Sequence, residues 1–171
     1  MTESRGSKGK IVVGVDGTPA SRAALRWAID EARHRGDRVH AVYALGSKMV
    51  AEAHSHSGPA AINPEVAEAA QVLDYAISGL ADTGEGAVEI EREVVEAAPS
   101  TALLTASLDA DLLVVGSRGH GAFTNLFLGS VSHDCAEHAP CPVVLVHSEE
   151  EQERRADRIA AAAGRRSRPR R

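Results

Sequence analysis

The sequence predicts an α/β protein with a doubly wound, open sheet of five parallel strands and helices on both faces. Residues 10–15, 112–115 and 142–146 are apolar runs rich in valine, without the alternation of a half-exposed strand. Such runs are typical of strands that are covered on both faces. Helical segments separate the predicted strands in strict alternation, and that order predicts parallel strands joined by right-handed crossovers.

Local signals define the first elements. The first predicted strand covers residues 10–15. Thr18 can cap the following helix, and Pro19 suits its first position because the missing amide hydrogen is not needed there. Gly36 marks the end of this helix, and residues 38–45 follow as the second strand.

The remaining elements repeat this alternation. Asn63 and Pro64 open the second helix in the same manner as Thr18 and Pro19 open the first. The later elements, in order, are the rest of that helix to about residue 80, a strand at 88–95, a helix at 100–108, a strand at 112–115, a helix at 130–137 and a strand at 143–146.

The chain divides into one folded domain and two polar ends. Its 171 residues suit a single domain, which we place at residues 10–148, with a disordered N-terminus at 1–9. In the charged tail, 149–171, Glu150 and Glu151 stand four residues before Arg154 and Arg155, which favours a short solvated helix. Disorder is expected after residue 164. The connection at 46–62 is either a lid over a ligand or a surface loop without a role.

Charge separates the tail from the domain. The formal net charge is −5, but residues 149–171 hold eight arginines against five acidic residues, which leaves the preceding part at −8. An acidic folded surface disfavours nucleic acid as a partner. We interpret the five arginines of residues 165–171 as part of a solvated tail. Contact of this tail with RNA, DNA or an anionic membrane is the alternative.

Two further absences bear on location and chemistry. No apolar run approaches membrane-spanning length, which predicts a cytoplasmic protein without a membrane partner. Cys135 and Cys141 lack the spacing of a zinc site, so we expect two buried, reduced thiols, with a redox role as the alternative.

The glycines after the strand at 112–115 predict a phosphate site. Gly116 and Gly119 are followed, after nine residues, by Gly129 and Ser130. This place, between the carboxyl end of a buried strand and a helix, is where open α/β sheets bind nucleotides. The glycines let backbone amides approach phosphate oxygens, and Arg118 adds a positive charge. A P-loop lysine and the G-x-G-x-x-G fingerprint are both missing, and turns without a ligand are the structural alternative.

Three motifs together resemble the universal stress protein family of the ATP-binding type. They are the glycine motif, residues 14–21 (GVDGTPAS) and residues 138–146 (HAPCPVVLV), and the resemblance runs from about Lys10 to His147. It implies the strand order 3-2-1-4-5, which places Asp16 and Gly116 at one crevice. It also implies a homodimer formed through the last strand.

The resemblance also assigns ligand-binding residues. Asp16 ends the first strand, where a carboxylate can bind a ribose hydroxyl or help hold Mg²⁺, although it could instead cap the next helix. Val42 is expected to contact adenine through its backbone. The residues expected around ribose and phosphates are Gly116, Arg118, Gly119, Gly129, Ser130, Val131 and Ser132.

These assignments predict an ATP-binding universal stress protein that acts as a nucleotide-dependent regulatory module in stress adaptation. The resemblance leaves AMP and cyclic AMP open as ligands. We assign no catalytic residue: His120 could orient water, but a solvated histidine is the commoner outcome. The alternative is a slow Mg²⁺-dependent ATP hydrolase or phosphotransferase that uses the same pocket.

Overall fold

Five parallel strands form one sheet in the order β3-β2-β1-β4-β5, in a computed structural model that describes residues 8–46, 63–80, 87–119 and 128–166. The predicted fold class and strand order are therefore confirmed. The strands are β1 Lys10–Gly14, β2 Arg38–Leu45, β3 Ile90–Glu96, β4 Leu112–Gly116 and β5 Val143–Val146.

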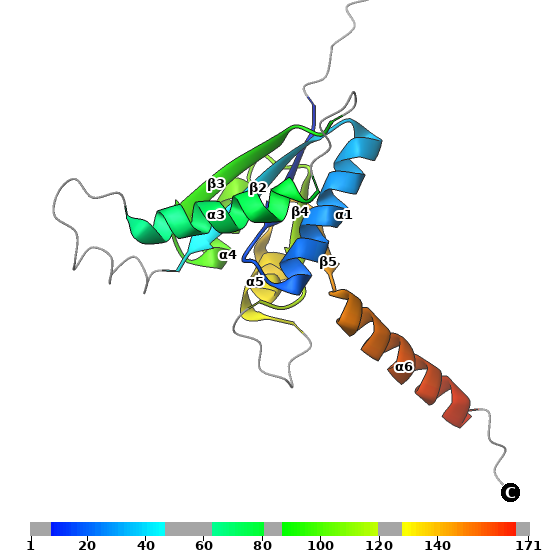
Figure 1. Ribbon diagram of the computed structural model, residues 1–171. Helices are drawn as coiled ribbons and strands as arrows, with labels where there is room; N and C mark the ends of the chain where they lie inside the picture. The colour runs from blue at the N-terminus through cyan, green and yellow to red at the C-terminus, as the bar shows by residue number, and fades with distance from the viewer. Residues whose placement is uncertain (1–7, 47–62, 81–86, 120–127, 167–171) are drawn as a thin grey trace, which may run out of the picture.

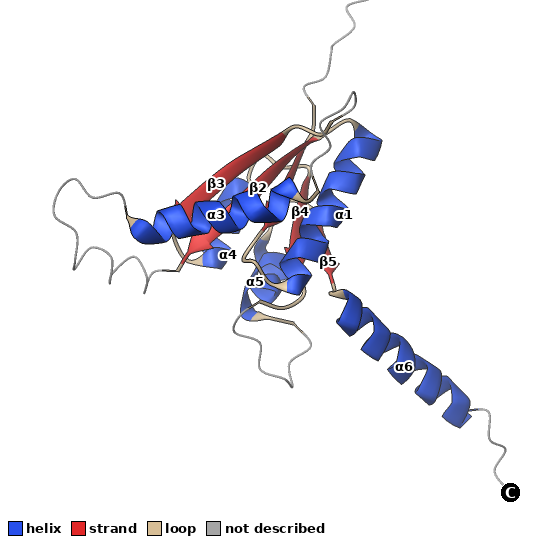
Figure 2. Cartoon of the chain, viewed as in Figure 1, coloured by secondary structure: helices blue, strands red, loops and turns tan. Residues whose placement is uncertain are grey.

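Of the described helices, two cover each face of the sheet (Figures 1 and 2). Helices α1 (Pro19–Arg35) and α3 (Pro64–Ser78) lie on one face, and α4 (Pro99–Ala106) and α5 (Ser130–His138) lie on the other. Each pair buries its apolar side chains against the sheet, which gives two separate core clusters. Within residues 10–146, the predicted helix and strand boundaries were accurate to about two residues.

Helix α1 follows the predicted local signals. The amide of Ser21 donates to the Thr18 side chain at 3.2 Å, and Pro19 occupies the first turn. Gly36 ends the helix with a φ of 75°, a left-handed conformation that glycine adopts without strain. The buried stripe of α1, which includes Ala24, Leu25 and Ala28, packs on the sheet.

The end of β4 touches the start of α1. A Cβ atom added to Gly116 would lie 2.9 Å from the carbonyl carbon of Ala20 and 3.0 Å from the amide nitrogen of Ser21. Both neighbours are backbone atoms that cannot rotate away. Glycine at this position therefore allows β4 to run close beneath the first turn of α1.

The last strand is less covered than the sequence predicted. We expected residues 142–146 to be buried on both faces, but Val143, Val144 and Leu145 are only half-buried and Val146 alone is buried. The reason is position, because β5 is at the edge of the sheet and pairs only with β4 among the described strands.

The C-terminal helix α6 (Glu149–Arg166) extends away from the sheet, with 18 residues (Figure 1). It is longer than the short helix we expected, and it continues through residue 164, where we placed the start of disorder. Its acidic first turn suits the positive end of the helix dipole, its alanine run has high helix propensity, and Glu150 pairs with Arg154 at 2.9 Å.

Some expectations concern residues outside the described ranges or the surface as a whole. Residues 1–7, 47–62 and 167–171 and His120 are outside those ranges.

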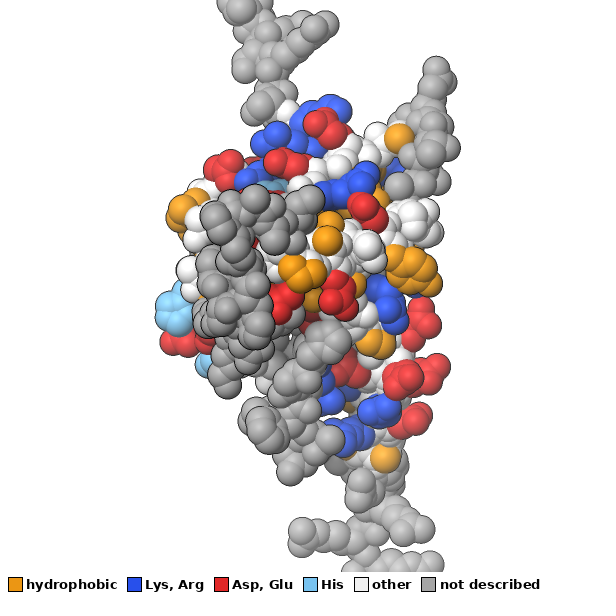
Figure 3. Space-filling view, turned by 60° about the vertical axis from the view of Figure 1, so that its left-hand side comes forward, with side chains coloured by type: hydrophobic (Ala, Val, Ile, Leu, Met, Phe, Trp, Pro, Cys, Tyr) orange, Lys and Arg blue, Asp and Glu red, His pale blue; other side chains and the backbone are white. Residues whose placement is uncertain are grey.

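On the face seen in Figure 3, acidic and basic side chains are interspersed rather than gathered by sign. No described helix has the length and apolar character to cross a membrane, and a cytoplasmic location stays a prediction.

The two cysteines differ in burial. Cys135 is fully buried on α5, whereas Cys141 is half-buried, so the prediction of two buried thiols is correct only for Cys135. Burial, with a smaller contribution from Asp134, raises the pKa of Cys135 to about 11.

We predict that Cys135 does not react with thiol reagents in the folded protein. At pH 8, a pKa of about 11 leaves on the order of one thiol in a thousand ionised, and burial blocks access. In a Cys141→Ser variant, Ellman's reagent should label Cys135 only at the rate of unfolding. Rapid labelling of native Cys141→Ser would contradict this environment.

We also predict that Gly116→Ala destabilises the fold. The added methyl group meets backbone atoms of α1, so β4 and α1 must separate, at a cost of about 1–3 kcal/mol. Gly79→Ala is the control, because an added Cβ there meets no atom within 4 Å. Urea unfolding should show a lower midpoint for Gly116→Ala alone; equal midpoints for both variants would refute the close contact.

Candidate functional site

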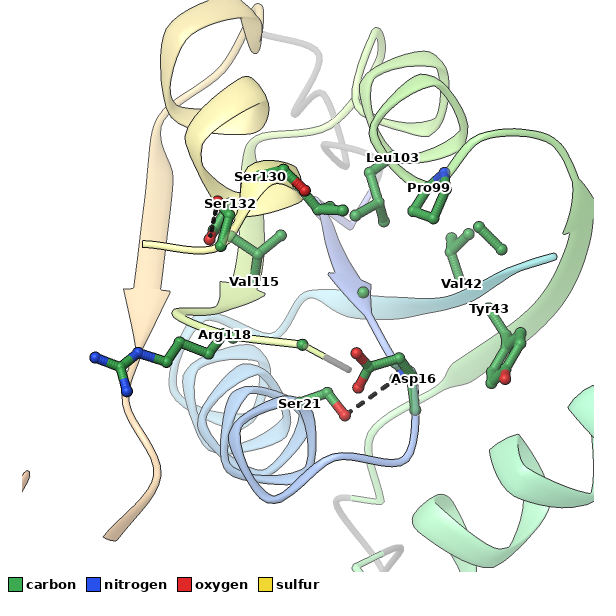
Figure 4. A pocket seen from close by; sticks show the side chains of 17 residues that line it. Asp16, Ser21, Val42, Tyr43, Pro99, Leu103, Val115, Arg118, Ser130 and Ser132 are labelled. Carbon is green, nitrogen blue, oxygen red and sulfur yellow. Dashed lines mark hydrogen bonds between the residues drawn. The ribbon is translucent and has the colours of Figure 1, made fainter. Parts of the chain in front are cut away.

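A pocket of about 310 Å³ opens at the carboxyl ends of β1 and β4 (Figure 4). These strands are paired, and the direction of winding reverses between them, which is where open α/β sheets form a ligand crevice. Every site residue that the sequence predicted lines this pocket: Asp16, Val42, Gly116, Arg118, Gly119, Gly129, Ser130, Val131 and Ser132.

The pocket has an apolar end and a polar end. Figure 4 shows Val42, Pro99 and Leu103 gathered on one side, from β2 and α4. Ser130 and Ser132 lie on the other side, at the start of α5. An adenine ring suits the first environment and phosphate groups suit the second.

Asp16 lies between the apolar and the polar end of the pocket, and its two carboxylate oxygens have different surroundings. Its Oδ1 accepts hydrogen bonds from the amide (3.0 Å) and the hydroxyl (2.6 Å) of Thr18, which shapes the turn before α1. Its Oδ2 lies beside Gly119, where an added Cβ would approach it to 2.7 Å. The helix-capping alternative is thus partly correct, since one carboxylate oxygen supports the turn while the residue still lines the pocket.

The start of α5 closes the polar end. The amide of Gly129 donates to the carbonyl of Ser117 at 2.9 Å, and the hydroxyl of Ser132 is 3.0 Å from the same carbonyl. These bonds hold the helix start against the loop after β4. Because the N-cap residue is glycine, it has no side chain to accept from the first amides of α5, and those amides are suited to an anion.

The fold itself does not require glycine at position 129. Its φ of −72° and ψ of 160° form extended backbone that any residue can adopt. Among the described residues other than its chain neighbours, the atoms nearest to an added Cβ are the Ser132 hydroxyl at 3.5 Å, the Arg118 Cα at 3.6 Å and the Gly119 amide nitrogen at 3.7 Å, which are ordinary contacts. Serine, asparagine or aspartate would cap α5 better. A side chain at residue 129 would therefore fit the described protein, and it would lie beside Ser132 and the loop at 118–119, which line the pocket.

Arg118 lines the pocket, but its guanidinium group points elsewhere. Figure 4 shows the side chain extending away from Asp16 and Ser130, toward the chain that follows β5. Its Nε lies 3.1 Å from Oε1 of Glu151, in the first turn of α6. The sequence did not predict this partner, because nothing in the order of elements places α6 beside the loop after β4.

Val42 and Tyr43 line the pocket from β2. The amide of Val15 already donates to the Val42 carbonyl at 2.9 Å, so sheet bonding uses part of its backbone. The carbonyl keeps a second lone pair, and the backbone contact with adenine stays a prediction. Burial, followed by the charges of Asp16 and Glu68, raises the pKa of Tyr43, which keeps the phenol protonated.

Several lining residues were missed. Six of them lie within or beside segments that the sequence had assigned to the site, so their place in the chain could have predicted them as lining residues: Gly14, Val15, Ser21, Tyr43, Ala44 and Val115. Pro99 and Leu103 belong to α4, and only tertiary packing brings that helix over β1. There, a Cβ atom added to Gly14 would lie 2.9 Å from Cδ1 of Leu103.

The described residues offer little for catalysis or for a metal held by protein alone. Asp16 is the only carboxylate among the described residues that line the pocket. His133 is exposed and lies 3.6 Å from Glu137, outside the lining. Within the described ranges, no group of three or more histidine, cysteine or acidic side chains is placed to hold a metal.

Comparison with known proteins agrees with this architecture. The family model described as "Universal stress protein family" matches residues 8–147. This chain belongs to the universal stress protein family. Universal stress protein Rv2623 of Mycobacterium tuberculosis is 32% identical over 152 residues, which cover 88% of this chain and 51% of that protein. The chain therefore spans about half the length of this relative.

Two solved universal stress proteins hold nucleotides. A universal stress protein in complex with cAMP has a TM-score of 0.54 and 27% identity, covering 84% of this chain and 99% of that one. The universal stress protein from Archaeoglobus fulgidus in complex with dAMP has a TM-score of 0.55 and 26% identity, covering 81% and 97%.

Proposed function

We propose that this universal stress protein binds an adenine nucleotide, ATP in the first place, and acts as a nucleotide-dependent regulatory module in stress adaptation. The observation that carries the proposal is the pocket itself, in which the first amides of α5, without a side-chain cap, stand beside a glycine that the described fold does not require. The apolar surface of Val42 and Leu103 suits the base. The cAMP and dAMP complexes of other family members support the ligand class.

Mg²⁺ fits this site only together with the nucleotide. Magnesium is usually held by one or two carboxylates, substrate phosphates and water. Asp16 supplies one carboxylate, part of which supports the turn at Thr18. In this proposal Asp16 either contacts the ribose or holds Mg²⁺ with the phosphates, and Mg²⁺ would neutralise phosphate charge. Phosphate release over many turnovers would instead indicate the alternative, a slow hydrolase.

Gly129→Ala tests the site without disturbing the fold. The methyl group makes only ordinary contacts with the described protein but adds bulk to the pocket lining next to the α5 amides, so we expect nucleotide affinity to fall about tenfold or more. Calorimetric titration with ATP, ADP, AMP and cyclic AMP, with and without Mg²⁺, measures it. The urea midpoint should stay that of the wild type.

Gly79→Ala is again the matched control and should bind as the wild type does. Unchanged affinity in Gly129→Ala would show that the space at residue 129 is not used by a nucleotide. Absence of binding in the wild-type protein would refute the proposed function itself.

We further propose a homodimer formed through β5. The strand leaves Val143, Val144 and Leu145 half-buried and pairs with no second strand among the described residues. A second copy can cover this edge symmetrically.

Sedimentation velocity at micromolar concentration should therefore give a mass near twice the 17.9 kDa of the chain. A single monomeric species across that concentration range would exclude the dimer.

A further inference from the structure

Glu151 differs from its neighbours in the first turn of α6. Its side chain is 13% exposed, whereas those of Glu149 and Glu150 are 82% and 79% exposed. Glu149 pairs with Arg26, and Glu150 pairs with Arg154, both near the surface. Glu151 instead turns inward, toward the loop after β4.

Both carboxylate oxygens of Glu151 have polar contacts. Oε1 lies 3.1 Å from Nε of Arg118, while Oε2 accepts from the hydroxyl of Ser117 at 2.7 Å and from the amide of Ser148 at 3.1 Å. Burial opposes ionisation of this group. The hydrogen bonds from Ser117 and Ser148 and the charge of Arg118 outweigh burial and lower the pKa of Glu151, so the carboxylate is charged at neutral pH.

The loop that Glu151 contacts also belongs to the polar end of the pocket. The carbonyl of Ser117 accepts from the amide of Gly129, and the next residue, Arg118, lines the pocket. One short segment therefore contacts α6 on one side and the start of α5 on the other. The family model ends at residue 147, so Glu151 lies just beyond the residues that it matches.

We propose that Glu151 sets the preference of the pocket for nucleotides by their number of phosphates. This inference rests on the proposed function. Without ligand, Glu151 holds Arg118 against α6. A polyphosphate and the Glu151 carboxylate are both anions that favour the same guanidinium group, and their charges repel each other. ATP must therefore displace Glu151 to reach Arg118, whereas adenosine has no phosphate to compete.

The competition also couples the pocket to α6. If ATP weakens the contact between Glu151 and Arg118, release of Glu151 must strengthen ATP binding by the same factor, since the coupling is reciprocal. Ser148 and Glu151 also bond to each other at the helix start, because the amide of Glu151 faces the Ser148 hydroxyl at 3.4 Å. Displacement of Glu151 therefore loosens the first turn of α6.

Glu151→Gln removes the charge while keeping the shape and the ability to bond with Ser117. Its affinity for ATP should rise about three- to fivefold, the upper part of the range expected for a partly exposed ion pair, with adenosine affinity changed less than about twofold. Glu150→Gln is the matched control, because it removes the same charge from an exposed side chain in the same turn. It should leave the affinities for both ligands within about twofold of wild type.

A second variant tests whether the effect passes through Arg118. With Arg118→Gln as the background, Glu151→Gln should no longer raise ATP affinity, because the contested group is absent. Equal changes for ATP and adenosine in Glu151→Gln, or equal effects of the Glu150 and Glu151 substitutions, would overturn the inference. Weaker ATP binding in Glu151→Gln would also overturn it, since Glu151 would then position Arg118 for the ligand.

Hydrogen exchange of the wild-type protein gives a readout that needs no variant. Saturating ATP should speed exchange at the amides of Glu151 and Gln152, which face Ser148, and adenosine should not. Unchanged exchange with ATP bound would refute the coupling while leaving nucleotide binding intact. If neither ATP nor adenosine binds the wild-type protein, the proposed function fails, and this inference fails with it.

Discussion

The pairing of β1 with β4 determines where the two loops at the centre of the site lie. Val13 is in register with Val114, so both strands end at the same edge of the sheet. Their continuations then face each other, with Asp16 after one strand and Gly119 after the other. Gly116 lets the end of β4 lie directly against the first turn of α1, which keeps the two loops close together. A side chain at that point would force apart the loops that form the pocket.

A second level of organisation connects this edge to the helices. In the loop after β4, the carbonyl of Ser117 accepts a hydrogen bond from Gly129 at the start of α5, and the Ser117 hydroxyl donates to Glu151 at the start of α6. The same loop contains Arg118, the cation of the described pocket lining, whose guanidinium group lies beside Glu151. Arg118 thus connects the pocket lining with α6, which lies beyond the residues that the family model matches.

The sequence predicted most of this arrangement because its strongest signals are local. Thr18, Pro19 and Gly36 define α1 by backbone chemistry alone, and the glycine spacing after β4 places the loop residues that line the pocket. Leu103 and Glu151 could not be predicted, since their positions depend on how α4 and α6 pack. The apolar run at 142–146 wrongly predicted burial on both faces, because such a run does not by itself show that its strand is at the edge, where the strand order implied by the resemblance does place it.

The most direct test of the central claim is an NMR titration of ¹⁵N-labelled protein with ATP. If the glycine-lined pocket binds the nucleotide, the largest amide shifts will occur at residues 116–119 and 129–132, with further shifts at 42–44 beside the apolar end. No shifts at saturating millimolar ATP, or shifts confined to surfaces away from β1, β4 and α5, would contradict the account.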